Sequence, residues 1–181
     1  GSYGTNFGFN CNFHGDSVVS GNYNACIGSN ATTSSNSSSG EFVLGDSNIS
    51  NLRCADTSIS SLSDRRDKTD IIDSPFGLTF LNSLRPVQFK WNKRKLTEVE
   101  NKEGRVDPLN GKTRVGFIAQ ELQEAQNKIG ETTNDILNLV QTDNPRRIEA
   151  KQGNLLPVIV KAVQELSAKV DELTTRVTAL E

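Results

Sequence analysis

The sequence predicts an α+β protein in three parts: an N-terminal β-repeat segment, a small mixed α+β body and a long C-terminal coiled-coil helix. Three observations carry this prediction. The first third of the chain is rich in Gly, Ser, Asn and Thr, the middle mixes strand and helix patterns, and the C-terminus has an unbroken apolar heptad pattern. We therefore predict two domains, 1–62 and 63–181, the second ending in a coiled coil over 155–181.

A sharp change in charge separates the two predicted domains. The charged residues before position 63 are Asp16, Glu41, Asp46, Arg53 and Asp56. Nearly all of the 20 basic and 22 acidic residues therefore lie in the second domain, as do all five prolines, whereas all three cysteines lie in the first. The two domains are built by different rules.

The composition also excludes several kinds of site. Three cysteines (Cys11, Cys26 and Cys54) with one histidine, His14, support neither a disulfide framework nor a zinc site, and they read as small buried thiols in a reducing compartment. No apolar run reaches the ~18 residues of a membrane span. The near-balanced net charge of −2 argues against a nucleic-acid surface. We predict no cofactor, no metal, no membrane contact and no nucleic acid.

A loose repeat organises the first domain. Phe7-Gly8, Ile27-Gly28 and Leu44-Gly45 each place an apolar residue before a glycine, with an asparagine shortly after, about 17 to 20 residues apart. Each repeat is too small to bury its own apolar face and must stack on neighbours or on other chains. The pattern is typical of solenoid or intertwined β structures, while the composition alone would also fit a disordered linker.

The body of the second domain alternates helix and strand patterns. Apolar residues in Phe76–Leu84 fall at helical spacing, and the residue before Pro86 ends that helix. Further elements are predicted as strands at Val87–Trp91 and Thr113–Ile118, a long excursion over 92–112, a helix at Ala119–Lys128 and weaker strands at Ile136–Val140 and Ile148–Ala150. These elements predict a small mixed α+β body.

The C-terminal heptad pattern is the clearest signal in the sequence. Apolar residues recur with a 3-4 alternation at Leu156, Ile159, Val163, Leu166, Val170, Leu173, Val177 and Leu180. This pattern predicts a coiled coil in preference to an amphipathic helix packed on its own domain. Asn154 is the expected N-cap, and Arg176 and Glu181 occupy positions for an interchain ion pair. Val at a and Leu at d lean towards a dimer, so the oligomeric state must come from elsewhere.

Ser63 and Lys68 form a candidate catalytic pair at the boundary between the domains. A serine hydroxyl becomes a good nucleophile when a nearby base takes its proton, and a lysine can be that base when burial keeps it neutral. Spacing alone is weak support and favours another interpretation, an N-cap serine and a surface lysine on a helix that starts near Asp64. The acidic series Asp64, Asp67, Asp70, Asp73 needs no metal, since first-turn acids suit a helix N-terminus.

Four motifs in order resemble a known family. They are Ser63-Asp64-Arg65-Arg66-Asp67-Lys68, Leu84-Arg85-Pro86-Val87-Gln88-Phe89-Lys90-Trp91, Gly116-Phe117-Ile118-Ala119-Gln120-Glu121-Leu122 and Ala162-Val163-Gln164-Glu165-Leu166. Residues from about 60 to 181 resemble the C-terminal intramolecular chaperone domain of phage tailspikes, tail fibres and endosialidases, a self-cleaving serine peptidase family that includes the myelin regulatory factor. The departure is the absence of an expected tyrosine between Ile148 and Leu155.

The resemblance implies a trimeric chaperone that helps a preceding, triple-β-helix-like fibre intertwine and then cuts itself off at Leu62–Ser63 with a Ser63–Lys68 dyad. Asp64 and Arg66 are expected to support local geometry, and Arg66, Gln120 and backbone N–H groups are candidate oxyanion donors. The implied partners are two further copies of the chain and the fibre as folding client. The implied location is a virion tail fibre or appendage, assembled in the host cytoplasm, with the chaperone part released after cleavage.

Two other functions stay open at this point. A structural trimerisation module that never cleaves would use the fibre segment to bind a receptor or glycan. A membrane-anchored regulator released by the same cleavage fits less well, because the upstream repeats are fibre-like. The sequence thus predicts a single-turnover serine endopeptidase, with a non-cleaving module as the alternative.

Overall fold

The computed structural model describes residues 3–14, 17–46, 48–56, 58–91, 111–130, 136–144 and 148–180. The chain divides into two compact units. The first comprises Gly1–Cys54, Gln88–Gly116 and Thr142–Ile148, and the second comprises Ala55–Val87, Phe117–Gln141 and Glu149–Glu181. The domain boundary predicted at residue 62 stays a prediction.

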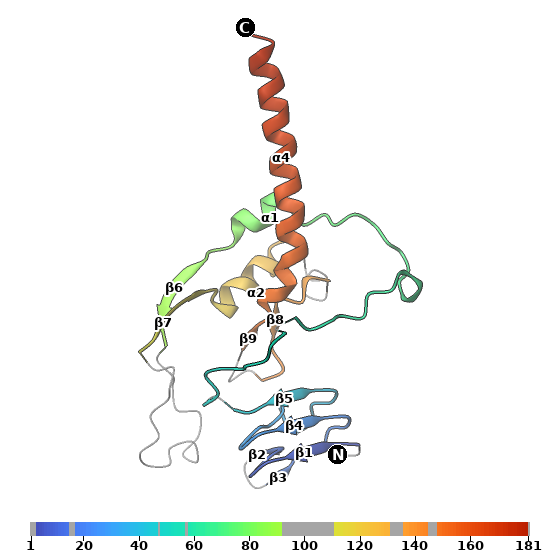
Figure 1. Cartoon of the computed structure of the whole chain (residues 1–181), viewed down its shortest axis with the longest axis vertical. Coiled ribbons are helices and arrows are strands. Elements are labelled where there is room, and N and C mark those ends of the chain that lie inside the picture. Colours follow the sequence, from blue (N-terminus) through green and yellow to red (C-terminus); the bar gives the residue numbers. More distant parts are fainter. Residues whose placement is uncertain are drawn as a thin grey trace. The chain divides into compact units, whose positions relative to one another are not determined.

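Three short strands of the first unit stack on one another as a parallel sheet. They are β1 (Thr5–Phe7), β4 (Ala25–Ile27) and β5 (Phe42–Leu44), in the order β1-β4-β5 (Figure 1). The register pairs Phe7 with Ile27 and Ile27 with Leu44. The predicted repeats therefore coincide with the strands, and each repeat is paired with the next repeat of the same chain.

Asparagine and glycine residues form the corners of this stack. Asn10 and Asn30 occupy equivalent corners with φ of 54° and 57°, the left-handed region that asparagine tolerates, and Asn10 Nδ2 donates to Asn30 Oδ1 at 3.2 Å. Gly8 has φ 141°, and a Cβ there would lie 2.6 Å from the Gly28 carbonyl oxygen. The apolar-Gly repeat therefore reflects a close approach of successive turns of backbone.

The interior of the stack is small. Cys11, Cys26 and Ala31 are buried, with Val43 packed against them, and both cysteines are free thiols. Burial raises the pKa of the Cys26 thiol, and the nearby Cys11 and Glu41 raise it further. Among the described residues, Cys11 and Cys26 thus fit the prediction of buried thiols, whereas Cys54 is exposed.

Two strand pairs complete the described part of this region. β2 (Phe13–His14) and β3 (Ser17–Val18) pair antiparallel. β6 (Val87–Lys90) pairs with β7 (Thr113–Gly116), and the Trp91 N–H donates to the Lys112 carbonyl at 3.1 Å. Both of the strands predicted around the long excursion are therefore present. Most of that excursion lies outside the described residues.

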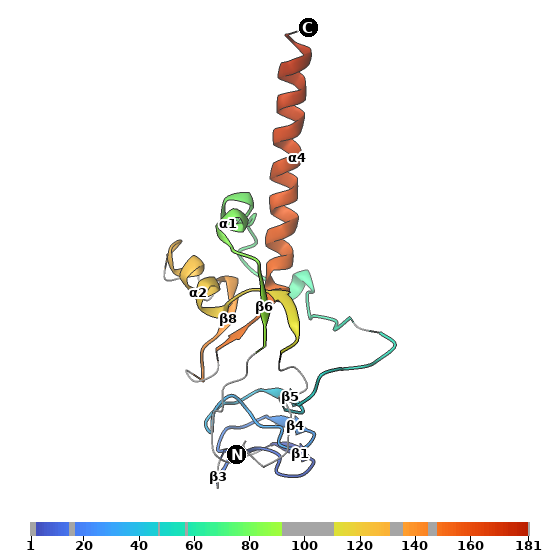
Figure 2. The same cartoon turned by 90° about the vertical axis from the view of Figure 1, so that its left-hand side faces the viewer.

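In the described residues of the second unit, helices and a strand pair pack around one apolar core. The elements of this unit are η1 (Arg65–Asp67), α1 (Leu78–Ser83), α2 (Ala119–Asn127), β8 (Val140–Gln141), β9 (Glu149–Ala150), η3 (Gln152–Leu155) and α4 (Leu156–Thr178) (Figure 2). The buried core residues are Phe76, Phe80, Ala125, Leu137, Leu139, Leu155 and Val158. Each large apolar side chain buried here contributes about 1.5–3 kcal/mol.

A polar side chain also helps to close this core. Gln126 on α2 is buried, and its Oε1 accepts the Leu139 N–H at 2.7 Å. A buried amide stabilises when its hydrogen bonds are made, and removing it would leave a backbone N–H without a partner. The helix α2 and the segment before β8 are therefore joined by a specific bond as well as by apolar contact.

The long helix begins differently from the prediction. Asn154 is not its N-cap, because η3 runs directly into α4 and Leu155 precedes the first helical residue. The Asn154 side chain instead donates to the Leu137 and Asn138 carbonyls, at 3.3 and 2.8 Å. Its amide thus ties the start of α4 to the core segment, a long-range role that local sequence does not reveal.

Most of the apolar seam of α4 is uncovered in the single chain. Val163, Val170, Leu173 and Val177 are 53–60% exposed, and their 3-4 spacing places them on one side of α4. The helix extends away from the other elements of its unit (Figure 1). Within the described residues no helix combines the length and apolar character needed to cross a membrane. The coiled coil stays a prediction that the exposed seam supports.

Candidate functional site

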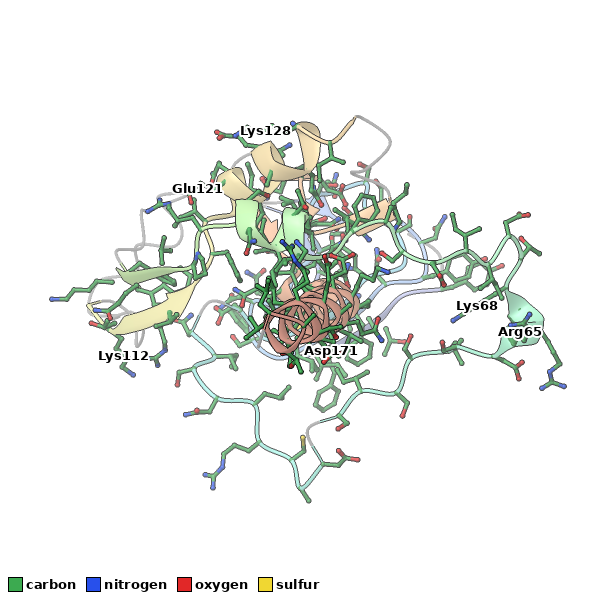
Figure 3. All side chains as sticks on the ribbon, turned by 90° about the horizontal axis from the view of Figure 1, so that it is seen from above. Arg65, Lys68, Lys112, Glu121, Lys128 and Asp171 are labelled. Atoms are coloured by element: carbon green, nitrogen blue, oxygen red, sulfur yellow. The ribbon has the colours of Figure 1, made fainter. Side chains whose placement is uncertain are left out.

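The predicted catalytic pair lies on an exposed segment before α1, here called the arm (58–74). All described residues of the arm are exposed, and it holds one turn of 3-10 helix, η1. Figure 3 labels Arg65 and Lys68 on this segment. No side chain of the arm is therefore buried against the rest of the chain.

Asp64 shapes this turn. Its Oδ1 accepts the Arg66 N–H at 2.9 Å, and its Oδ2 pairs with the Arg66 guanidinium at 2.7 Å. These bonds hold the pKa of the Asp64 carboxyl below its ordinary value. Asp64 is thus the N-cap of η1, so the alternative interpretation of Ser63 as a helix N-cap is wrong. Asp64 and Arg66 are engaged with each other.

The turn brings Ser63 and Lys68 together. Lys68 ends η1, where its N–H donates to the Arg65 carbonyl at 3.2 Å, and its Nζ donates to Ser63 Oγ at 2.5 Å. This separation is within proton-transfer reach. When the amine is neutral, the same contact lets the hydroxyl donate to nitrogen. The pair then has the arrangement of a nucleophile and its base.

The scissile bond predicted before Ser63 is also fully accessible. Leu62 has a relative exposure of 101%, and Ser63 and Lys68 are exposed as well. Burial is what favours the neutral form of an amine. The single chain therefore contains the two reacting groups in contact, but not the dry surroundings that a lysine base needs.

Gln120 is not brought to the pair. It lies in the first turn of α2 and is exposed, and among the hydrogen bonds of the described residues none joins it to Ser63 or Lys68. Its predicted oxyanion role has no support from this arrangement. Likewise, no group of three or more His, Cys, Asp and Glu side chains suited to a metal occurs in the described ranges.

One ion pair that the sequence did not reveal joins two of the four motifs. Arg85 donates to Glu121 through both Nε, at 3.0 Å from Oε2, and Nη2. These hydrogen bonds hold the pKa of the Glu121 carboxyl below its ordinary value. The two charges lie inside the motifs Leu84–Trp91 and Gly116–Leu122, and no local pattern in the sequence pairs them.

A comparison with known families supports the resemblance noted in the sequence. Residues 63–131 match the peptidase S74 family model, described as chaperone of endosialidase. The match begins at Ser63 and includes the first three motifs. It supports an intramolecular chaperone role, and the family name suggests peptidase activity. No curated protein matches the chain.

Proposed function

Because residues 63–131 match the family model described as chaperone of endosialidase, we propose that this chain is an intramolecular chaperone that cuts itself. It drives trimerisation and folding of a viral, most simply phage, tail fibre or appendage. It then releases itself by breaking the Leu62–Ser63 bond once. The observation that carries the cleavage step is the 2.5 Å contact between Lys68 Nζ and Ser63 Oγ.

The chemistry follows from that contact. Neutral Lys68 takes the hydroxyl proton, and Ser63 Oγ attacks the Leu62 carbonyl carbon. The C–N bond breaks, the Ser63 nitrogen receives a proton and becomes a free amine, and Leu62 is held as an ester on Oγ. Water then hydrolyses the ester, which leaves a Leu62 carboxylate and restores the Ser63 hydroxyl. Backbone N–H groups are the preferred oxyanion donors, because the Arg66 guanidinium is engaged by Asp64.

Assembly is the step that makes the pair competent. In the single chain both reacting groups are exposed, whereas a lysine acts as a base in surroundings that exclude water. Covering the arm with the surface of another copy would remove water and favour the neutral amine. Cleavage therefore waits until the copies have come together.

Copies are held together by α4. Its exposed seam of Val and Leu is continued by Leu166 and Leu180, and burying such a seam is the driving force of a parallel coiled coil. The heptad residues lean towards two strands, and the choice of three rests on the family resemblance. The predicted ion pair of Arg176 involves Glu181, which lies outside the described residues.

The client is the β-repeat segment that precedes the cut. Its small interior and short strands leave large apolar side chains exposed, among them Phe7, Phe42 and Leu44 at 76, 67 and 47%. A stack with so little core needs neighbouring copies to be stable. After cleavage this segment stays in the fibre, and the second domain leaves.

Denaturing electrophoresis of the purified chain tests the proposal. Wild type separates into two fragments, and N-terminal sequencing of the C-terminal one begins at Ser63. Ser63→Ala and Lys68→Ala each leave more than about 99% of the chain intact, since loss of either member of such a pair costs several orders of magnitude in rate. Ser61→Ala, a hydroxyl two residues away, is the matched control and cleaves normally. Wild type that forms trimers and stays intact would refute the proposal.

One observation favours the alternative, a non-cleaving trimerisation module with a glycan- or receptor-binding fibre segment. Tyr3 and Tyr23 stack at a centroid distance of 5.2 Å, yet they are 78 and 68% exposed. An exposed pair of aromatic rings with polar edges is suited to a ligand. The two functions separate in the same experiment, because the alternative predicts no cut in any variant.

A further inference from the structure

The helix α4 has a second contact surface besides its exposed seam. Val158 and Ala162 are buried to 3 and 1% relative exposure, and Phe80 of α1 is buried to 5%. The two helices pack together. Glu165 follows on the same side of α4, because residues 158, 162 and 165 are spaced by about one helical turn. The same helix therefore carries an assembly seam and a contact surface for α1.

Glu165 makes the polar link between these helices. Its Oε2 accepts the Leu78 N–H at 2.8 Å, over 87 residues of sequence. Leu78 opens α1, and Gly77 before it offers no side-chain cap. The first N–H groups of a helix have no partner inside it. Glu165 thus supplies from α4 the cap that α1 lacks.

Gly77 leaves room for this contact. A Cβ at residue 77 would lie 2.4 and 2.5 Å from the Glu165 carboxylate oxygens. The carboxylate ends a flexible side chain, so an alanine at 77 would push it away without requiring the backbone to move. Gly77 and Glu165 are therefore one coupled unit, which we call the clasp.

The clasp lies at the point where the arm ends. Downstream of Lys68 the chain runs exposed until Phe76, and α1 is its first helix. The contacts that fix the start of α1 therefore also fix the position of the C-terminal end of the arm. Since the seam and Glu165 belong to one rigid helix, the arm is anchored to the same element that joins the copies.

We propose that Glu165 is a positioning residue for self-cleavage, which acts by capping α1 and so anchoring the arm of Ser63 and Lys68 to the assembling helix. This inference rests on the proposed function. Glu165 contacts neither reacting group; its effect is on where the arm is held. Misplacement of reacting groups by about 1 Å can cost up to a hundredfold in rate.

The test follows newly synthesised, labelled chains by native and denaturing electrophoresis of the same samples. Glu165→Ala forms trimers in the wild-type amount, because the seam is intact, and these trimers cleave about ten- to a hundredfold more slowly. Glu165→Gln retains an acceptor for the Leu78 N–H and cleaves within about threefold of wild type. Glu172→Ala is the matched control: Glu172 is exposed and lies one heptad further along, beyond α1.

A double-mutant cycle with Gly77→Ala completes the test. Gly77→Ala alone slows cleavage as Glu165→Ala does, and the two together slow it little more than either, because both remove the bond between Glu165 and the Leu78 N–H. Trimers of Glu165→Ala that cleave at the wild-type rate, even with a lowered melting temperature, would reduce Glu165 to a structural role and overturn the inference. Failure of wild type to cleave would instead refute the proposed function.

Discussion

Arg85 and Glu121 illustrate what single residues contribute in this molecule. Their side chains are 67 and 35% exposed, and their hydrogen bonds join the end of α1 to α2. A pair in this setting adds little stability, because water screens it. Its value is geometric, since a guanidinium and a carboxylate meeting through two bonds define one orientation.

The depressed pKa of Glu121 gives a pH-dependent outcome. A carboxyl whose pKa is lower in the folded state stabilises the fold above its unfolded pKa, about 4.3, and that contribution is lost as pH falls through the folded value. Wild type should therefore lose about one or two degrees more in melting temperature than Glu121→Gln between pH 6 and pH 3. Glu124→Gln, which removes an exposed carboxyl from the same helix, is the matched control and should lose as much melting temperature as wild type. An identical acid response in Glu121→Gln would contradict the assignment.

Among the elements, the helix α4 has two apolar sides, one buried and one exposed. Val158 and Ala162 are buried by the chain's own core, while Val163 and Val170 remain exposed. A helix that packs only on its own domain would bury one stripe and be polar elsewhere. The second, exposed apolar stripe therefore supports the prediction that α4 forms a coiled coil with other copies of the chain.

A charge in the seam should separate the copies. Val170→Asp would bury a carboxylate at an a position, and we expect the dissociation constant of the assembly to rise about a hundredfold or more. Ala168→Asp places the same charge on the outer side of the helix, where it is exposed, and should leave the assembly intact. Sedimentation of the uncut Ser63→Ala background gives the mass of each variant. Equal masses for Val170→Asp and Ala168→Asp would argue against the seam as the interface.

At the scale of the whole molecule, the proposed cut would divide a client from its assembler. The β-repeat segment has a minor core of Cys11, Cys26 and Ala31, whereas the second unit has a core of aromatic and aliphatic residues. The larger apolar core therefore lies in the second unit. Once severed, the fibre segment would be held by its neighbours and by its kinetic barrier to unfolding.

This division predicts irreversible unfolding after cleavage. When denatured and diluted back, the uncut Ser63→Ala chain should recover most of its trimer, because assembler and client remain joined. Cut wild type should recover several-fold less, since the fibre segment must find its partners without the seam. Size-exclusion chromatography of both samples measures the recovery. Equal recovery would show that the second domain is not needed for assembly.

Local patterns in the sequence predicted most of the elements of the structure. The repeat spacing located β1, β4 and β5, helical and alternating patterns located α1, β6, β7 and α2 to within a few residues, and the heptads located α4. The pair Ser63–Lys68 and the four motifs pointed to the family matched over 63–131. These features repeat or lie within a few residues of one another, so the backbone geometry of one element relates them.

The tertiary structure alone decided the contacts between distant residues. The Arg85–Glu121 pair, the Gln126–Leu139 bond, the Asn154–Leu137 bond and the bond of Glu165 to the Leu78 N–H span 13 to 87 residues. No local period encodes such pairs, because their partners meet only when whole elements pack. The sequence by itself thus predicted most of the elements and the pairing of Ser63 with Lys68, because each lies within a short stretch of chain. The packing of α1 on α4 was decided by the tertiary structure, because it joins residues that are far apart in the sequence.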